Sequence, residues 1–324
     1  MVDARIVAGG HVRDVHALVR PARRITGMSA VLLPLTTEGA VDWPAVEAHI
    51  ARTVEAGLTP AVNMDTGYVQ LLGVDDRRRV LDLASEVTGG RFVAGAYVAD
   101  RSGDPFDLRA YAVEASAVAE RGGTPVIFPS HGLNGRDDDG WVDALRQLGD
   151  ELDRFLGFEL GSMFVPYGRI PSLKAFGGMV EIPHCIGAKH SSLSRQAEWD
   201  RLVVRDALRP DFMLLTGNDL AIDMVVYGSD YLLGLSTFAP DLFARRDRLW
   251  ADGDPAFYEL NDVLQHLGHL TFRPPVPAYR HDAALFFQLR GWASSDATPA
   301  GVPRRPASER DLLVGIAERL GVLA

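Results

Sequence analysis

The stretch Ile182-Pro-His-Cys-Ile-Gly-Ala-Lys-His-Ser-Ser192 has the form of a short buried strand that ends in one lysine, Lys189, before polar residues and a new helix. The residues directly ahead of the lysine are small and apolar, which suits an inner strand packed on both faces. Because desolvation of a buried ammonium is costly, we expect part of the Lys189 amine to be neutral near pH 7. A neutral amine in such a place is the nucleophile that Schiff-base enzymes use. The alternative is a strand-end lysine that extends into solvent.

The bulk composition is that of a globular protein. The chain has 324 residues, of which 47% are hydrophobic and 23% are charged, and this length suffices for one (β/α)8 barrel with additions. A net charge of -10 does not suggest a nucleic-acid partner. Cys185 is the only cysteine, which excludes a disulfide framework and predicts a cytoplasmic location. No apolar run approaches the ~20 residues of a membrane span, and the N-terminus lacks the layout of a signal peptide, so we expect no membrane partner.

Strand-like runs alternate with helix-like stretches along most of the chain. In the first helix, Asp42 can cap the N-terminus, Pro44 suits the first turn, and Gly57 ends the helix. The predicted strands are Gly27–Pro34, Thr59–Asn63, Phe92–Tyr97, Pro125–Phe128, Phe155–Glu159, the lysine strand within Ile182–Ser192, Phe212–Thr216 and Tyr231–Leu235. This alternation predicts one parallel barrel closed on itself. A doubly wound open sheet is the alternative, but the chain lacks a glycine-rich phosphate loop after its first strand.

Two additions flank the predicted barrel, which we expect to span residues 25–240. Residues 1–24 are interpreted as an N-terminal extension or a helix across the barrel bottom. Residues 241–324 carry a helical pattern that is broken at Pro274-Pro275 and from Pro299 to Pro306. We expect this C-terminal region to pack on the barrel as part of a single structural domain, because its aromatic residues carry enough apolar surface to cover it.

Polar residues that directly follow the strands are the candidates for an active site, because barrel enzymes carry their chemistry on this face. The set contains an amine, several acids and bases, and small residues that can bind a carboxylate. It comprises Asn63, Asp65, Thr66, Gly67, Ser130, His131, Glu159, Lys189, His190, Gly217, Asn218, Asp219, Ser236 and Thr237.

Five short motifs occur in an order that points to a known family. They are Gly27–Pro34 with Gly39 and Val41-Asp42, Asn63-Met-Asp-Thr-Gly67, Ile186-Gly-Ala-Lys189, Leu215-Thr-Gly-Asn-Asp219 and Gly234-Leu-Ser-Thr237. They resemble motifs of the dihydrodipicolinate synthase / N-acetylneuraminate lyase family of class I aldolases. The first three resemble the family's opening strand, its Gly-Thr-Thr-Gly-Glu carboxylate turn and its Gly-Ile-Lys Schiff-base strand. The last two resemble its Ser-Gly-Asp-Asp and Gly-Val-Ile-Ser segments. The resemblance covers nearly all of residues 25–324. It implies a TIM barrel, an imine at Lys189, no cofactor, and a homo-oligomer, commonly a dimer or tetramer.

The chain departs from the family at several places around the lysine. Members carry a tyrosine at the end of strand five, in a Tyr-Asn-x-Pro motif that relays protons, whereas a gap-free comparison places Glu159 there. The paired tyrosines after strand four are replaced by Ser130 and His131. In the carboxylate turn, Asp65 replaces a threonine and Tyr68 replaces the glutamate. A carboxylate at Asp65 would repel pyruvate at close range, which argues against pyruvate as the substrate.

Three residues are candidates for proton transfer beside Lys189. Glu159 stands in an apolar strand, so we expect a raised pKa that suits a general acid or base. The alternative is a buried glutamate that pairs with Lys189 or an arginine. His131 and His190 could shuttle protons near pH 7, or each could make a structural hydrogen bond, with His190 pointing away from the pocket.

The remaining candidates concern substrate binding and a second hydroxyl. Asp65 could hold a substrate hydroxyl or amine, or cap the next helix; Thr66 and Gly67 could bind an acidic group through backbone N–H groups. On the loop after strand five, Tyr167 could supply a catalytic hydroxyl and Arg169 a carboxylate clamp, or the loop could be an ordinary surface segment. The further substrate-binding candidates are Asn218, which could instead cap a helix, and Ser236.

These residues predict a lyase that forms a Schiff base between Lys189 and a 2-oxo acid or related small carbonyl compound, with cleavage or formation of a carbon–carbon bond. A sugar-acid dehydratase with the same imine chemistry is one alternative. A carbonyl-binding barrel without catalysis, which the lost tyrosine favours, is another. A metal site built from His131, Glu159, Asp65 and His190 is a weaker hypothesis, since no closely spaced ligand pair supports it.

Overall fold

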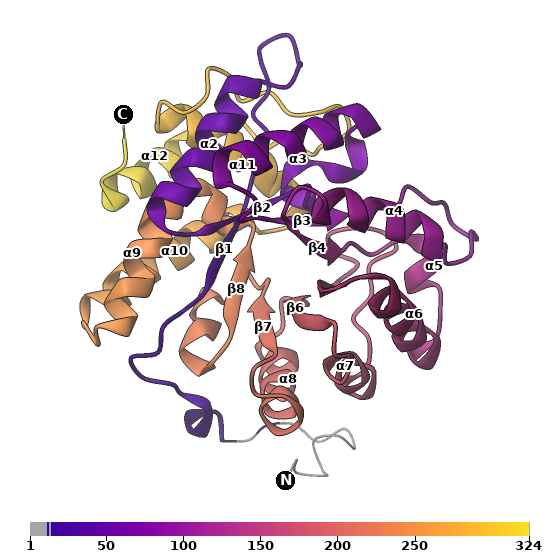
Figure 1. The fold of residues 1–324 in the computed structure, drawn as a ribbon. Helices are drawn as coiled ribbons and strands as arrows, with labels where there is room; N and C mark the ends of the chain where they lie inside the picture. The colour runs from indigo at the N-terminus through magenta and orange to yellow at the C-terminus, as the bar shows by residue number, and fades with distance from the viewer. Residues whose placement is uncertain (1–11, 13, 324) are drawn as a thin grey trace.

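The computed structural model describes residues 12 and 14–323, and its centre is a closed barrel of eight parallel strands in sequential order (Figure 1). The strands are β1 Gly27–Ala30, β2 Thr59–Val62, β3 Val93–Ala96, β4 Thr124–Ile127, β5 Phe155–Leu160, β6 Cys185–Ser191, β7 Met213–Thr216 and β8 Asp230–Leu233. Strand β1 pairs with both β2 and β8, which closes the sheet. The predicted (β/α)8 barrel is therefore confirmed, and the open-sheet alternative is wrong.

Helices connect the strands around the outside of the barrel. They are α2 Trp43–Ala56, α3 Val74–Thr88, α4 Leu108–Ala119, α5 His131–Asn134, α6 Asp138–Glu151, α7 Leu173–Val180 and α8 Arg195–Leu208, while a 3-10 helix, η4 Ile222–Tyr227, joins β7 to β8. As predicted, the Asp42 side chain accepts a hydrogen bond from the Ala45 N–H, and Gly57 ends α2 in the left-handed conformation.

The barrel interior is filled by apolar side chains from most of its strands. Met28, Ala61, Val126, Phe158 and Leu215 belong to one buried cluster drawn from five strands. Because successive side chains of a strand point to opposite faces, their neighbours in sequence face the surrounding helices. This alternation decides which polar residues can reach the barrel mouth.

The C-terminal helices cover one side of the barrel beside α2 (Figure 1). They are α9 Pro240–Ala251, α10 Ala256–Thr271, α11 Tyr279–Leu289 and α12 Glu309–Leu320. Their aromatic side chains Trp250, Phe257, Phe286 and Phe287 are buried in the largest apolar cluster of the described chain, whereas Tyr258 is exposed. Packing of this region on its own barrel thus accounts for most of its aromatic surface.

The segment before β1 lies against the end of the barrel where the strands begin. After the 3-10 helix η1 Val15–Leu18, Arg23 pairs with Asp230 and donates to the Ser229 carbonyl, both at the start of β8. The rest of the predicted N-terminal extension, residues 1–11 and 13, lies outside the described residues. None of the helices that the structure describes is long and apolar enough to cross a membrane.

Candidate active site

Strand β6 delivers Lys189 to the inside of the barrel. Lys189 is only 4% exposed, and its neighbours in register are Phe158 on β5 and Leu215 on β7. The Phe158 ring centroid lies 4.6 Å from Nζ, a distance at which the ring face attracts a cation. Gly217 leaves room for the lysine, because a Cβ atom there would lie 2.8 Å from Lys189 Cε. The lysine is therefore a buried amine on the inner face, not a residue that extends into solvent.

Asp65 provides the counter-charge for this amine. It begins the 3-10 helix η2 Asp65–Gly67 directly after β2, and its Oδ1 atom lies 3.8 Å from Lys189 Nζ. Tyr279 of α11 donates its hydroxyl proton to Oδ2 over 3.0 Å. Burial and the nearby Asp65 raise the pKa of Tyr279 well above its usual value, so this hydroxyl keeps its proton. Among the described residues Oδ1 has no hydrogen-bond partner, which leaves it available to a ligand.

The turn that follows Asp65 differs from the predicted anion-binding loop. The Thr66 hydroxyl forms a hydrogen bond with Tyr279 Oη over 2.9 Å. The N–H groups of Gly67 and Tyr68 donate to the carbonyls of Met64 and Asp65 and close the turn internally. Gly67 is required for a different reason, because a Cβ atom there would lie 2.8 Å from the Val31 carbonyl oxygen. The Gly67 N–H is therefore engaged within the turn, and the binding of an acidic group at Thr66 and Gly67 stays a prediction.

Asp219 is a second buried acid near Lys189. Its Oδ1 atom accepts a hydrogen bond from the Leu235 N–H over 2.7 Å. Burial raises the pKa of Asp219 to about 7, with Lys189 opposing the shift and Asp65 reinforcing it. Two buried acids, one from the end of β2 and one from the end of β7, therefore interact electrostatically with the lysine.

The two other predicted substrate-binding residues near β7 and β8 have different positions. Asn218 is buried, and its Oδ1 atom accepts from the Leu220 N–H, whereas its Nδ2 atom has no partner within residues 14–323. The Leu220 bond forms a turn ahead of η4, whose N-cap is Ala221 without a side-chain cap, so the predicted capping by Asn218 is wrong and its amide keeps a free donor. Ser236 donates its hydroxyl to the Leu233 carbonyl, so its proton is engaged within the chain.

Tyr167, on the loop after β5, lies beside His131, the first residue of α5. Their ring centroids are 4.4 Å apart, and the Tyr167 carbonyl accepts a hydrogen bond from Asn134. Burial, with Tyr97 and Asp100 nearby and a smaller effect of Asp65, raises the pKa of the Tyr167 hydroxyl. Tyr167 also packs against the cluster of apolar residues inside the barrel. The Tyr167 ring therefore lies against the barrel mouth and not in solvent.

Arg169 does not provide a free carboxylate clamp. Its guanidinium pairs with Asp138 at the start of α6 and donates to the Arg136 carbonyl. The guanidinium predicted to bind a substrate carboxylate is therefore already paired with a carboxylate of the chain.

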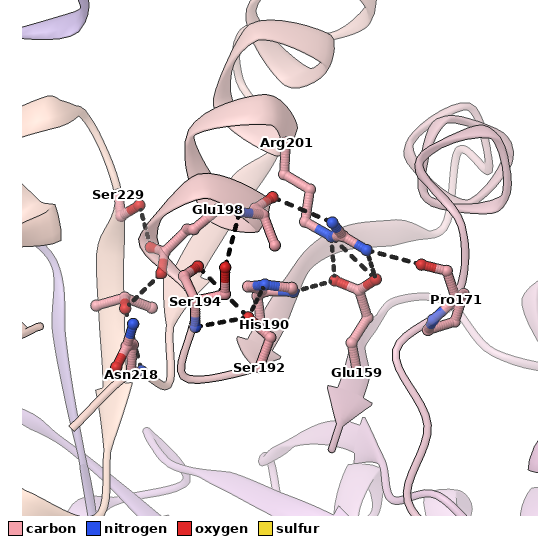
Figure 2. Close-up of polar contacts among 11 residues, drawn as sticks. Glu159, Pro171, His190, Ser192, Ser194, Glu198, Arg201, Asn218 and Ser229 are labelled. Carbon is pink, nitrogen blue, oxygen red and sulfur yellow. Dashed lines mark hydrogen bonds and ion pairs between the residues drawn. The ribbon is translucent and has the colours of Figure 1, made fainter. Parts of the chain in front are cut away.

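Glu159 points toward Arg201 of α8 (Figure 2), and it lies in register with His190, whereas its neighbour Phe158 lies in register with Lys189. Arg201 of α8 binds both of its carboxylate oxygens, with a shortest distance of 2.6 Å, and His190 Nδ1 lies 2.7 Å from Oε2. Burial alone would raise the pKa of Glu159, but Arg201 and His190 outweigh it and lower the pKa to about 2. The predicted raised pKa is wrong, and the alternative of a buried glutamate paired with an arginine is confirmed.

His190 belongs to the same outer network. Its Nε2 atom lies 2.7 Å from Ser192 Oγ, so both ring nitrogens have partners, and the side chain points away from the pocket as one of the two predicted alternatives required. Nearby, the buried carboxylate of Glu198 accepts from Thr216 and Ser229 (Figure 2). Burial raises the pKa of Glu198 to about 7, opposed by these hydroxyl groups.

The side chains of the metal hypothesis do not all lie on the same face of the sheet. Asp65 lies near Lys189 inside the barrel, whereas Glu159 and His190 face α8 on its outside. In the part of the chain that the structure describes, no group of three such side chains could hold a metal ion.

Sequence reasoning missed three residues next to the lysine. Ser191 lies two residues after Lys189 and so shares its face; its buried Oγ atom has no partner in the described chain, and a Cβ atom on Gly217 would touch it. Phe158, not Glu159, is the β5 residue that faces inward beside Lys189, because it is in register with the lysine. The two-residue period of side chains along a strand could have identified Ser191 and Phe158 as inward-facing. Nothing in the local sequence could have identified Tyr279, which reaches Asp65 from 214 residues away.

A closed (β/α)8 barrel with a buried lysine on its sixth strand is the arrangement that the resemblance to class I aldolases implies. Comparisons with known proteins agree with this class. The 4-hydroxy-tetrahydrodipicolinate synthase of Hyphomonas neptunium is 27% identical over 226 residues, which are 67% of this chain and 72% of that protein. The enzyme of the same name from Gluconobacter oxydans is 24% identical over 252 residues, which are 75% of this chain and 78% of that protein.

Solved structures agree in fold. Dihydrodipicolinate synthase from Thermotoga maritima superposes with a TM-score of 0.77 at 16% identity, over 93% of this chain and 100% of that one. No family model matches the chain. The chain is therefore similar in sequence to 4-hydroxy-tetrahydrodipicolinate synthases and shares the barrel fold of solved dihydrodipicolinate synthases.

Proposed function

We propose that the protein is an aldolase-type lyase in which Lys189 forms a Schiff base with a small carbonyl substrate. The observation that carries this proposal is the single buried amine at the inner end of β6, 3.8 Å from the otherwise free Asp65 Oδ1 atom. A buried lysine beside an acid has both the nucleophile and a proton acceptor in place.

The proposed imine step uses these two groups in turn. Asp65 accepts a proton from the Lys189 ammonium, and the neutral amine then attacks the carbonyl carbon to form the C–N bond and a carbinolamine. Asp65 returns the proton to the carbinolamine oxygen, which leaves as water, and the nitrogen retains its remaining proton as a protonated imine. The protonated imine draws electrons from the neighbouring carbon, so a carbon–carbon bond there can break or form through an enamine.

Tyr167 is the proposed second proton carrier. Its hydroxyl is kept protonated near neutral pH by burial and by its neighbours, so it can donate to a leaving or newly formed oxygen and recover the proton afterwards. His131, whose ring contacts Tyr167, would link this hydroxyl to solvent. Glu159 has no part in the proposal, because its carboxylate is engaged by Arg201 on the other side of the strand.

Reductive trapping tests the proposal with an internal control. The chain contains only two lysines, the buried Lys189 and Lys174, whose side chain is 75% exposed. Sodium borohydride treatment with a panel of aldehydes and ketones should place a covalent mass on the Lys189 peptide in preference to the Lys174 peptide. Labelling of Lys174 alone, or normal turnover by Lys189→Ala, would contradict the proposal.

A carbonyl-binding barrel without turnover is the second candidate, and Phe158 is the observation that favours it. The ring beside Lys189 has no hydroxyl to relay protons, as the family's tyrosine at the end of strand five does. Saturable trapping of a ligand that is released unchanged would support binding alone, whereas release of a cleaved or condensed product would support the lyase.

We further propose a homo-oligomer that works in the cytoplasm, as the family resemblance and the single buried thiol of Cys185 suggest. Light scattering of the purified protein on a sizing column would distinguish a monomer from a dimer or tetramer.

A further inference from the structure

The surroundings of Lys189 are acidic. The amine lies near two buried carboxyl groups, those of Asp65 and Asp219, and the face of Phe158 also favours positive charge. A protonated imine on Lys189 would keep the charge balance of the ammonium that it replaces. A carboxylate attached to the imine carbon would instead add a third acidic group within a few ångströms of Asp65.

Three donors of the turn after β2 that could bind such a carboxylate are already engaged. The Gly67 and Tyr68 N–H groups close their own turn, and the Thr66 hydroxyl is paired with Tyr279. These are the atoms of the turn that occupies the position of the family's carboxylate-binding loop. In this chain the turn presents a carboxylate oxygen, Asp65 Oδ1, to the lysine, and so it is an acceptor of protons rather than a donor.

Three arginines around this end of the barrel also have partners within the chain. Arg280 donates to the carbonyls of Asp65 and Pro277, and Arg169 pairs with Asp138. Arg77 donates to the Leu72 carbonyl and lies over the Tyr97 ring. None of these contacts directs a guanidinium at Lys189.

We infer that the substrate of this site is a neutral ketone or aldehyde with a hydroxyl group on the carbon next to the carbonyl, and not a 2-oxo acid. The inference rests on the proposed Schiff base. In the imine, the substrate hydroxyl would donate its hydrogen bond to Asp65 Oδ1, which gives this buried acceptor the partner that the chain itself does not supply. The buried Ser191 Oγ and Asn218 Nδ2 atoms offer further hydrogen bonds to a hydroxylated substrate.

Hydroxyacetone and pyruvate form a matched pair of probes for this inference. Both are three-carbon methyl ketones, and they differ only in whether the carbon beside the carbonyl carries a hydroxyl group or is a carboxylate. Each would form the same bond, with the Lys189 nitrogen joined to the central carbon and one water released. Borohydride then adds hydride to the imine carbon and fixes the adduct for mass spectrometry.

Lys174 corrects the comparison for the intrinsic reactivity of the two ketones. It is exposed and pairs with Asp139 over 3.1 Å, so it is a solvent-exposed lysine–aspartate pair in the same molecule. We expect the ratio of hydroxyacetone to pyruvate adduct to be at least about tenfold higher at Lys189 than at Lys174, because charge repulsion in a buried site greatly exceeds that in water. An equal or smaller ratio at Lys189 would overturn the inference.

The variant Asp65→Asn assigns the preference to its cause. It removes the negative charge with little change in shape, so the ratio at Lys189 should fall toward the ratio at Lys174 even if trapping slows with both ketones. An unchanged ratio in a folded variant would contradict the role of Asp65. If the proposed Schiff base does not form, neither ketone will label Lys189 in the wild-type protein. Preferential labelling by pyruvate would instead overturn the inferred substrate class while supporting the Schiff base.

Discussion

Each face of strand β6 carries a buried basic side chain beside a carboxylate, but the two faces differ in how far these groups are hydrogen-bonded. On the inner face, Lys189 lies in register with Phe158 and Leu215 and has one carboxylate oxygen 3.8 Å away. On the outer face, the next residue, His190, lies in register with Glu159 and Thr216 and has a hydrogen bond at each ring nitrogen. Both faces are buried, and a single step along the strand separates them.

The difference lies in how far each polar group is satisfied. In the outer network Glu159 accepts from both Arg201 and His190, and Arg201 also donates to the carbonyls of Ala197 and Pro171. Within residues 14–323, the inner face leaves the Asp65 Oδ1 and Ser191 Oγ atoms without a hydrogen bond. Buried polar atoms that a fold leaves unpaired are costly, so the two beside this lysine support the proposed ligand site. The satisfied network is interpreted as structural.

The largest expected effect separates the faces by function. Replacing the inner lysine, Lys189→Met, removes the nucleophile but keeps an unbranched chain in the barrel, so turnover should fall by about 10³-fold or more while the fold is retained. The matched outer change, His190→Gln, should leave borohydride trapping at Lys189 intact. Mass spectrometry and circular dichroism of both variants make the test, and loss of trapping only in His190→Gln would reverse the assignment of the two faces.

The second prediction concerns stability and belongs to the outer face. Arg201→Met should lower the free energy of unfolding by about 3–5 kcal/mol, because it leaves the buried Glu159 carboxylate without its main partner. Urea denaturation measures the loss. The double variant Glu159→Leu with Arg201→Met should recover much of it, since no unpaired charge then remains. A double variant as unstable as the single one would contradict a purely structural pair.

The barrel itself was accessible from sequence because its signals are local. Strand-like runs, the Asp42 cap and the Gly57 stop each act within a few residues, and the structure keeps all of them. The position of Lys189 at the inner end of β6 followed from the apolar residues before it. Helix α5, only four residues long, carried too weak a pattern to be predicted.

The surroundings of the lysine were harder to predict, because they depend on register and on distant segments. Glu159 was placed in the pocket by a count along the chain, and a shift of one residue in a strand moves a side chain to the opposite face. Arg201, which fixes that outer face, comes from the next helix but one. The engagement of Asp65 by Tyr279 joins β2 to the C-terminal region and has no local signal.

The third prediction uses pH to contrast one acid from each face. The pKa of Glu159 is lowered to about 2 from an unfolded value near 4.5, so its stabilising contribution is complete above pH 4.5 and is lost as the pH falls toward 2. The pKa of Asp219 is raised to about 7 from 3.8, so the folded state is favoured at low pH and loses this contribution as the pH rises from 4 to 7.

Two variants measure these opposite slopes. The stability gap between wild type and Glu159→Gln should shrink from pH 5 to pH 3. In contrast, the free energy of unfolding of Asp219→Asn should increase relative to that of wild type between pH 5 and pH 8. Each change should be on the order of 1–3 kcal/mol in urea denaturation. Parallel slopes for the two variants would mean that the faces do not differ in the way that these contacts imply.

The smallest expected effect comes from making the inner face resemble that of the dihydrodipicolinate synthase family. Phe158→Tyr would place a hydroxyl beyond the ring that now lies 4.6 Å from Lys189 Nζ. If proton transfer limits imine formation, borohydride trapping should accelerate by up to about tenfold, less than the 10²–10⁴-fold of a well-positioned acid or base, because Asp65 already supplies one acceptor. The new hydroxyl should cost about 1 kcal/mol of stability unless it finds a partner in the pocket. If the variant is less stable but its trapping rate is unchanged, Asp65 and Tyr167 already move protons faster than the carbon–nitrogen bond forms. The loss of the tyrosine is then compensated by these two residues.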